Sequence, residues 1–136
     1  METRVAPPES HLDLLERPLF ACFGTIAPDG SPRVNPMWFL WDRAQGVVKL
    51  THTKRRHNFR FLQRDGRVAL AWTDPDDAYR YLSMWGVVAG VEDDPSGAFY
   101  QLLQQRYRGY TTEVKDRDVR VVLSIRALGW KARDPD

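Results

Sequence analysis

The chain of 136 residues is predicted to fold as a mostly β protein, an antiparallel barrel with peripheral helices that occupies residues 1–136 as one domain. Three observations predict this class. Several apolar and β-branched runs have the length of strands, short turns rich in Gly, Pro and Asp link many of them, and no alternation of strands with crossover helices is present. At 43% hydrophobic residues, the chain can bury a substantial core.

Six strands are expected. The first two form a hairpin around the turn at residues 28–31, Pro-Asp-Gly-Ser. Pro36 lies inside the second strand, which indicates an edge or a bulge, and Gly86 and Gly90 indicate bulges in the long fifth strand. The expected strands are residues 19–26, 32–41, 46–51, 67–73, 79–92 and 119–125.

The first two of three expected helices have recognisable N-terminal signals. Ser10 and Asp13 resemble a capping box at the start of a short leucine-rich helix, which Pro18 ends. Thr53 is the expected N-cap of a second helix over residues 54–64, and this helix would begin with three consecutive cations.

The third expected helix has signals at both ends. Asp94 is the expected N-cap, Pro95 is suited to the first helical position, and Gly109 follows the last turn. Three residues at this end either reach over a neighbouring site or pack locally: Tyr107, Arg108 and Tyr110.

The second strand ends in an unusual apolar run. Residues 37–41, Met-Trp-Phe-Leu-Trp, are apolar on both faces, whereas a half-solvated strand would alternate. The second face must therefore pack on a helix, a planar ligand or another subunit. For Trp38 and Trp41, packing in a dimer is the default interpretation.

The charge of the chain is concentrated in residues 43–64. This basic segment holds seven of the 20 Lys and Arg residues, two of the three His residues and no acid. The other 13 cations face 18 acids, so a body of charge −5 carries one cationic segment. The segment predicts a phosphate or carboxylate site, although its charges could instead pair with Asp74, Asp76 and Asp77. Nucleic acid is a disfavoured partner because the remaining surface is acidic.

Several classes of protein are disfavoured by what the sequence contains. The single Cys22 permits no disulfide framework and is expected to be a small buried hydrophobic residue. No metal site is expected, because His52 and His57 have no carboxylate cluster beside them. No apolar run has the length of a signal or a membrane span, which predicts a cytoplasmic protein without a membrane partner.

Four local motifs carry a resemblance that covers nearly the whole chain. In order they are residues 29–34 with 36–39, residues 56–70, Asp74-Pro75 with residues 79–81, and Gly129-Trp130. Together they resemble the split β-barrel family of pyridoxamine 5'-phosphate oxidase-like flavoproteins, in particular the deazaflavin-dependent oxidoreductases. The resemblance implies a six-stranded split β-barrel of the FMN-binding type that forms a homodimer.

The basic segment matches the family pattern with three departures. Arg56 and Arg60 match its first two arginines, and residues 64–68 match its end except at Gly66, where Pro is usual. Asn58 stands where the family usually has Lys, and Phe61 stands where Asn is usual. Because the family Lys is expected to contact the cofactor phosphate, Asn58 leaves open the choice between the deazaflavin coenzyme F420 (F-420) and FMN.

The resemblance also implies a function. The protein would bind F420, or alternatively FMN, at sites built by two subunits, and would transfer hydride to a small unsaturated organic substrate. A flavin- or haem-binding module without turnover is a further alternative, and no catalytic side chain is implied. The implied cofactor-binding residues are Arg33, Asn35, Pro36, Met37, Thr51, His52, Thr53, Arg56, Asn58, Arg60, Tyr79 and Arg80, with Trp72 as a further candidate for closing the pocket.

Overall fold

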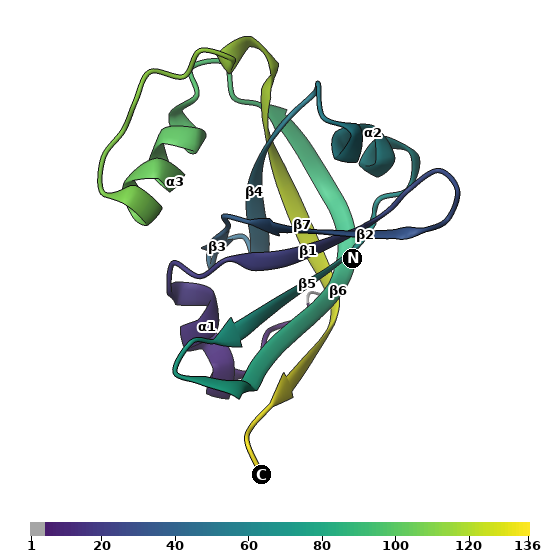
Figure 1. Ribbon diagram of the computed structural model, residues 1–136, viewed down its shortest axis with the longest axis vertical. Coiled ribbons are helices and arrows are strands. Elements are labelled where there is room, and N and C mark those ends of the chain that lie inside the picture. The colour runs from purple at the N-terminus through teal and green to yellow at the C-terminus, as the bar shows by residue number, and fades with distance from the viewer. Residues whose placement is uncertain (1–4) are drawn as a thin grey trace.

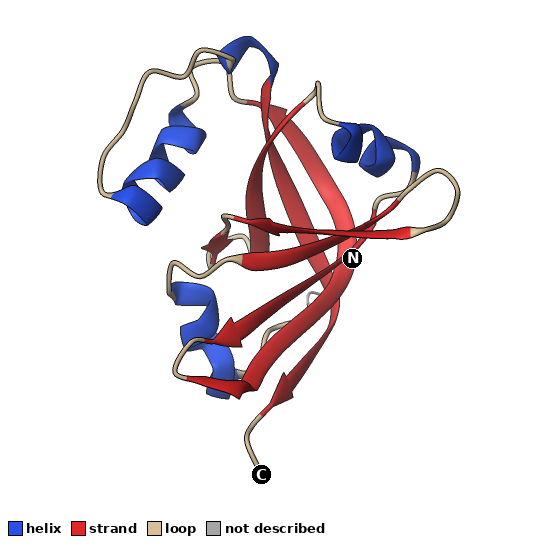
Figure 2. Cartoon of the chain, viewed as in Figure 1, coloured by secondary structure: helices blue, strands red, loops and turns tan. Residues whose placement is uncertain are grey.

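Seven strands form one antiparallel sheet in the computed structural model, which describes residues 5–136 (Figure 1). Their order across the sheet is β2-β1-β5-β6-β7-β4-β3. Three α-helices lie outside the sheet in the same residues (Figure 2), and none of them is long and apolar enough to cross a membrane. The strands are β1 (Ala21–Ile26), β2 (Pro32–Met37), β3 (Leu40–Asp42), β4 (Val47–Thr53), β5 (Arg67–Asp74), β6 (Asp77–Asp93) and β7 (Arg120–Arg133). The helices are α1 (Leu12–Glu16), α2 (His57–Arg64) and α3 (Ala98–Arg108), with short 3₁₀ turns η1 (Glu9–His11) and η2 (Arg117–Val119).

The predicted class is confirmed, but the predicted strand count and barrel closure are not. The described sheet has seven strands rather than six, because the strand expected at residues 32–41 is two strands, β2 and β3. Only Trp38 and Phe39 separate them, yet they lie at opposite edges of the sheet. The sheet must therefore curl until its two edges approach each other, and no ladder joins β2 to β3 within residues 5–136.

Tyr107 of α3 accounts for the break between β2 and β3. The backbone N–H of Phe39 donates to the Tyr107 hydroxyl at 3.1 Å, and that hydroxyl lies 2.5 Å from the carbonyl oxygen of Leu19. Backbone groups that would extend a ladder are thus satisfied by a side chain. Phe39 turns into the core, while Trp38 stacks on Tyr107. A helix, a planar ligand and another subunit were the predicted partners of the doubly apolar run. For Trp38 the partner is a helix, α3.

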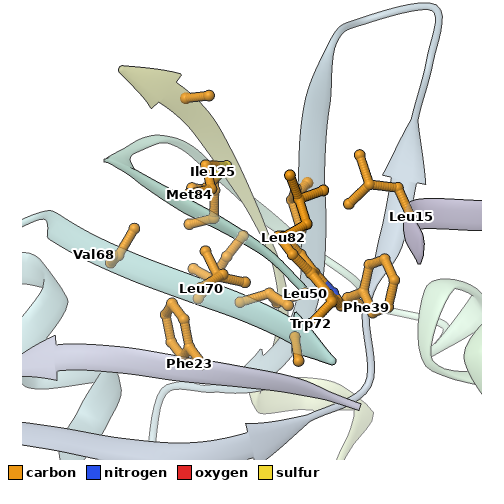
Figure 3. Packing of buried hydrophobic residues seen from close by; sticks show 14 of the residues in the cluster. Leu15, Phe23, Phe39, Leu50, Val68, Leu70, Trp72, Leu82, Met84 and Ile125 are labelled. Atoms are coloured by element: carbon orange, nitrogen blue, oxygen red, sulfur yellow. The ribbon is translucent and has the colours of Figure 1, made fainter. Parts of the chain in front are cut away.

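The core fills the inside of the curled sheet (Figure 3). Phe23 of β1, Leu50 of β4 and Trp72 of β5 are almost completely buried there, in agreement with the period-2 alternation of these strands. Leu15 of α1 and Phe59 of α2 belong to the same buried cluster, so both helices are fixed to the sheet by apolar packing.

Two predictions about irregular strand positions are confirmed. Pro36 lies in an edge strand, since β2 pairs with β1 alone among the described strands. The pairing of β6 with β7 shifts register at Gly86 and again before Gly90. A Cβ atom at Gly86 would lie 2.2 Å from the carbonyl oxygen of Arg126, so this bulge requires glycine.

The second helix is shorter than predicted. α2 begins at His57, and its N-cap is Arg56, which makes no side-chain capping bond. Thr53 is not a cap because β4 continues through it, where it pairs with Arg120 of β7. The cations at residues 54–56 therefore form a turn between strand and helix rather than the first helical turn.

The predicted capping box of the first helix is wrong. Ser10 Oγ hydrogen-bonds the Nδ1 atom of the neighbouring His11 at 2.7 Å, and the N-cap of α1 has no side-chain capping bond. Asp13 instead accepts hydrogen bonds from Arg80 of β6. This carboxylate therefore joins α1 to the sheet.

The third helix starts three residues later than predicted. Gly97, at φ 73°, is its N-cap. Asp94 still satisfies two of the free backbone donors of the first turn, because its carboxylate accepts from the N–H groups of Phe99 at 3.3 Å and Tyr100 at 3.2 Å. Gly109 ends the helix with φ 78°, as predicted.

The outer side of the sheet carries a continuous apolar surface. The strand register places Val34, Cys22, Ala71, Ala69 and Trp85 on this side of β2, β1, β5 and β6, and we call this set the outer apolar face. Val34 is 67% exposed and Trp85 is 50% exposed. The prediction that Cys22 is buried is therefore wrong, because β1 alternates and Cys22 occupies an outward position.

Candidate cofactor site

An open pocket of about 230 Å³ lies where the end of β2, β4, α3 and the start of β7 approach one another. These elements are far apart in sequence, and the curl of the sheet brings them together. The lining is basic and aromatic, a combination suited to a planar ligand that carries an anion. The lining residues are Phe20, Pro36, Met37, Trp38, Thr51, Arg56, Tyr100, Arg108 and Arg120.

Three arginines face this pocket, and they differ in how they are held. No carboxylate in residues 5–136 lies within ion-pair distance of Arg56 or Arg108. Arg108 at the end of α3 lies over the Trp38 ring, 4.8 Å from its centroid. Arg56 is exposed in the turn before α2. Two of the three charges thus remain available to an anionic ligand.

Arg120 is the buried member of the three. It is 9% exposed, and its guanidinium lies 3.9 Å from the centroid of the Tyr100 ring. Its Nε donates to Asp116 at 3.0 Å and one terminal nitrogen donates to the Thr51 hydroxyl at 3.3 Å. These contacts fix the plane of the guanidinium at the pocket wall.

An aromatic stack forms the α3 side of the pocket. Trp38 lies parallel to Tyr107, with ring centroids 5.0 Å apart and an interplanar angle of 7°. Tyr100 stacks on the same indole at 6.2 Å, and Phe20 meets Tyr107 edge-on at 5.8 Å. Burial raises the pKa of the Tyr107 phenol, so this hydroxyl stays protonated and keeps its structural hydrogen bonds.

His52 lies behind the pocket and does not line it. The side chain is 3% exposed, and its Nδ1 accepts a hydrogen bond from the backbone N–H of Thr53 at 2.9 Å. Burial, together with the positive charges of Arg56 and Arg120, lowers the pKa of His52. The imidazole is therefore uncharged near pH 7. Its pKa responds to the positive charges of Arg56 and Arg120.

Four of the twelve predicted cofactor-binding residues line the pocket together. They are Pro36 and Met37 from β2, Thr51 from β4 and Arg56 from the turn before α2. The family resemblance implied all four, and the charge of the basic segment also pointed to Arg56. The structure thus joins the two sequence regions that the prediction selected.

Five other predicted residues lie near these elements without lining the pocket. Asn35 faces the same side of β2 as Met37, and Arg33 donates from Nε to Ser31 Oγ at 3.2 Å. Thr53 is buried at the end of β4. Asn58 and Arg60 lie on α2, Asn58 half-buried and Arg60 exposed.

The remaining two predicted binding residues lie on β6, at the α1 end of the sheet. Tyr79 is 76% exposed there. Arg80 donates to the carboxylates of Asp13 at 2.7 Å and Asp74 at 3.0 Å, and to the carbonyl oxygen of Ser10. The structure does not bring Tyr79 or Arg80 to the pocket. The further candidate, Trp72, is fully buried in the core.

Some cations of the basic segment are paired, but not with the acids that the sequence suggested. Lys54 pairs with Asp93 at 2.9 Å, and Lys49 pairs with Asp42 at 2.9 Å. A longer contact of 3.9 Å joins Arg55 to Asp118. Asp74 and Asp76 pair with Arg17, and Asp74 also pairs with Arg80.

Five residues that line the pocket were not among the predicted cofactor-binding residues. They are Phe20, Trp38, Tyr100, Arg108 and Arg120. For Arg108 the signal was present, since the end of the third helix was a candidate for reaching the site. Arg120 stands at the start of a strand, and no local pattern distinguishes it from other arginines.

The other hollows of the surface lack this combination of charge and aromatic walls. One of about 300 Å³ lies between residues 5–12 and Trp41, and only Arg43 lines it with positive charge. Two more are depressions around the outer apolar face, and Arg33 and Arg67 line one of them without an aromatic side chain. Within residues 5–136 no three His, Cys, Asp or Glu side chains gather where they could hold a metal ion.

Comparison with known protein families identifies the family of this chain. Residues 7–134 match the family described as pyridoxamine 5'-phosphate oxidase. The chain belongs to this family. Its resemblance to that family, first indicated by the sequence motifs, is thereby confirmed, and no match was found among proteins with curated descriptions.

Solved structures agree with the family assignment. An F420 reductase shares 42% sequence identity with this chain at a TM-score of 0.86, over 91% of this chain and 98% of that one. A conserved hypothetical protein from Mycobacterium tuberculosis is 24% identical at a TM-score of 0.75, with 98% and 90% covered. General Stress Protein 26 from Bacillus anthracis is 15% identical at 0.71, with 94% of each chain covered. The last two show the fold alone.

Proposed function

We propose that this protein is an oxidoreductase that binds the deazaflavin coenzyme F420 in the pocket described above and transfers hydride to a small unsaturated organic substrate. The observation that carries the proposal is the set of three arginines at an aromatic-lined pocket, two of them without a carboxylate partner in residues 5–136. A phosphate-bearing planar cofactor fits both features, since the cations suit its phosphate and the aromatic walls suit its ring.

The similarity to an F420 reductase supports F420 as the first choice of cofactor. At 42% identity over 91% of this chain, that protein is a much nearer relative than the solved structures that show the fold alone. FMN is the second candidate because the family as a whole is described by an oxidase, pyridoxamine 5'-phosphate oxidase. Both cofactors carry a phosphate, so the same cations serve either one.

The residues of the pocket divide the work between binding and orientation. When bound, the cofactor supplies the hydride chemistry itself. Arg56 holds its anionic part, and Thr51 offers a hydroxyl between β4 and β7. Pro36, Met37 and Trp38 give the ring an apolar wall. His52, neutral and buried, moves no proton to the substrate in this proposal.

Binding and turnover are tested by two linked experiments on the purified protein. Titration with F420 and with FMN is followed by tryptophan fluorescence, which Trp38 in the pocket wall makes sensitive to occupancy. The proposal expects F420 to bind more tightly than FMN, and expects reduced F420 to be reoxidised in the presence of unsaturated organic acceptors. A preference for FMN would favour the flavin alternative, and binding without reoxidation would favour a module without turnover.

We further propose that the protein acts as a homodimer whose subunits meet through the outer apolar face. Val34 and Trp85 are large apolar residues exposed on this face, and Cys22, Ala69 and Ala71 extend it without charge across four strands. Monomeric proteins rarely leave such a contiguous patch uncovered. A second copy of the chain is the partner that the family resemblance implies.

The oligomeric state is measured by sedimentation equilibrium. Trp85→Glu places a charge on the β6 side of the face and should shift a dimer to monomer. Leu102→Glu is the matched control, because Leu102 is 48% exposed on α3 and lies off the face. A monomeric wild type, or a dimer that Trp85→Glu leaves intact, would contradict this interface.

A further inference from the structure

The basic segment lacks one positive charge of the family motif, and Arg120 of β7 brings a positive charge to the same pocket. Asn58 occupies the motif position where the family usually has Lys, and it lies half-buried on α2 without lining the pocket. Arg56 is then the single cation of the basic segment in the pocket wall. A phosphate normally receives more than one charge-assisted hydrogen bond.

Arg120 has donors left for a ligand. A guanidinium offers five N–H groups. Asp116 takes the one on Nε, Thr51 accepts one from the first terminal nitrogen, and the second terminal nitrogen makes no hydrogen bond within residues 5–136. The Tyr100 ring covers one face of the group at 3.9 Å. The pocket-facing edge is therefore oriented and has unsatisfied donors.

Arg106 provides a contrast on the same side of the molecule. Both of its terminal nitrogens donate to backbone carbonyl oxygens, those of Glu16 at 3.3 Å and Arg17 at 2.8 Å. These two nitrogens join α3 to the end of α1. The one donor of Arg106 without a hydrogen-bond partner, Nε, is buried and closed to a ligand, whereas the free terminal nitrogen of Arg120 is not among the buried unpartnered atoms of residues 5–136.

Arg56 and Arg120 both act on the imidazole of His52. Both lower the pKa of His52 through their positive charge, so both guanidinium groups lie within electrostatic range of one imidazole. Asp116 is the single carboxylate paired with either of them in residues 5–136. Two cations that share one counter-charge gain from an anion placed between them.

We infer that Arg120, with Arg56 and Thr51, forms the phosphate-binding part of the pocket and supplies the charge that Asn58 does not. This inference rests on the proposed function for the identity of the cofactor. The binding of the phosphate group itself is a property of these three residues, and it can be measured without the cofactor.

The test is a titration of the full-length protein with inorganic pyrophosphate, read by calorimetry and by the shift in melting temperature. Arg120→Gln should weaken pyrophosphate and F420 binding by about tenfold or more. Arg117→Gln is the matched control, because it removes the same charge from an exposed position three residues earlier that does not line the pocket. Its affinity should match that of the wild type.

Asp116→Asn separates a binding role of Arg120 from a structural one, even if Arg120→Gln fails to fold. Removing the carboxylate should strengthen pyrophosphate binding by about fivefold, because it takes a negative charge away from the anion site. If Arg120 serves only to pair with Asp116, this variant should lose melting temperature without binding pyrophosphate more tightly.

The outcomes distinguish this inference from the proposed function. If the wild type binds F420 and Arg120→Gln binds it equally well, the inference is overturned and the function stands. If the wild type binds neither F420 nor FMN, while Arg120→Gln still loses pyrophosphate affinity, the function fails and the anion site stands. No pyrophosphate binding by the wild type would overturn the inference.

Discussion

Two pairs of arginines, one pair at each end of the sheet, are used in opposite ways. At the α1 end, Arg17 and Arg80 are paired with Asp13, Asp74 and Asp76. At the other end, near α2 and α3 in Figure 1, Arg56 and Arg108 lack a carboxylate partner among residues 5–136. We interpret the first group as stabilising the fold and the second as the ligand-binding group of the proposed function.

The electrostatics of the α1 end agree with a structural role. Hydrogen bonds from Arg80 hold the pKa of Asp13 below its ordinary value, and the backbone N–H of Asp76 does the same for Asp74, with help from Arg80 and Arg17. These carboxylates join α1 to β5 and β6. Their charges are satisfied before any ligand arrives.

The largest expected effect comes from removing a pocket cation. Arg56→Ala should lose about 1.5–3 kcal/mol of F420 binding, the value of a hydrogen bond to a charged group, which corresponds to roughly 10–150-fold in affinity. Its melting temperature should stay within about 1 °C of the wild type, since no ion pair is lost. Fluorescence titration and thermal unfolding measure the two quantities.

Arg64→Ala is the control for this comparison. Arg64 belongs to the same basic segment and is exposed at the end of α2, away from the pocket lining. It should bind F420 as the wild type does. Equal losses in both variants would mean that the charge of the whole segment, and not the pocket, attracts the cofactor.

Removing a paired arginine should have the opposite profile. Arg80→Gln leaves Asp13 and Asp74 without their shared partner and should lower the melting temperature by about 5 °C, with F420 affinity unchanged. Arg67→Gln is the matched control, because its pair with Asp65 is exposed and should cost about 1 °C or less. A loss of F420 affinity in Arg80→Gln at normal stability would return Arg80 to the binding residues.

The smallest expected effect is a pH dependence of stability. Its pH range differs between His52 and the carboxylates at the α1 end. The lowered pKa of His52 means that the unfolded chain, whose histidine titrates near 6.5, takes up a proton before the folded protein does. The stability contributed by neutral His52 is therefore complete above pH 6.5 and decreases as the pH falls below it. Asp13 and Asp74, whose pKa values lie below 3.8, lose their contribution only below that pH.

Urea unfolding between pH 7 and pH 5 measures this contribution. The wild type should become less stable over this range, and His52→Gln should show a flatter profile because the titrating group is gone. Saturating pyrophosphate should also flatten the wild-type profile, since a bound anion offsets the charges of Arg56 and Arg120. An unchanged slope in His52→Gln would assign the titration to another group.

Local sequence patterns predicted much of the fold. Alternation and turn residues gave the order of the elements, the edge position of Pro36 and the bulges at Gly86 and Gly90. The break at residues 38–39 was not predictable, because it depends on the hydroxyl of Tyr107, which is 68 residues away in sequence. The N-cap at Thr53 was wrong for a similar reason, since pairing with β7 extends β4 through it.

Four of the nine residues that line the candidate site were predicted. Pro36, Met37, Thr51 and Arg56 come from two segments whose composition and motifs pointed to an anion and a planar group. Arg108 and Arg120 come from α3 and β7, and their place in the pocket depends on the curl of the sheet. A long-range contact of this kind leaves no periodicity or spacing for sequence analysis to detect.

The most direct test is the crystal structure of the protein with F420 bound. We expect the cofactor phosphate to lie within hydrogen-bond distance of Arg56 and Arg120, between β4 and β7, with the ring against Met37 and Trp38. A phosphate bound at the α1 end, or on α2 beyond reach of both arginines, would contradict the assignment of ligand binding to Arg56 and Arg120.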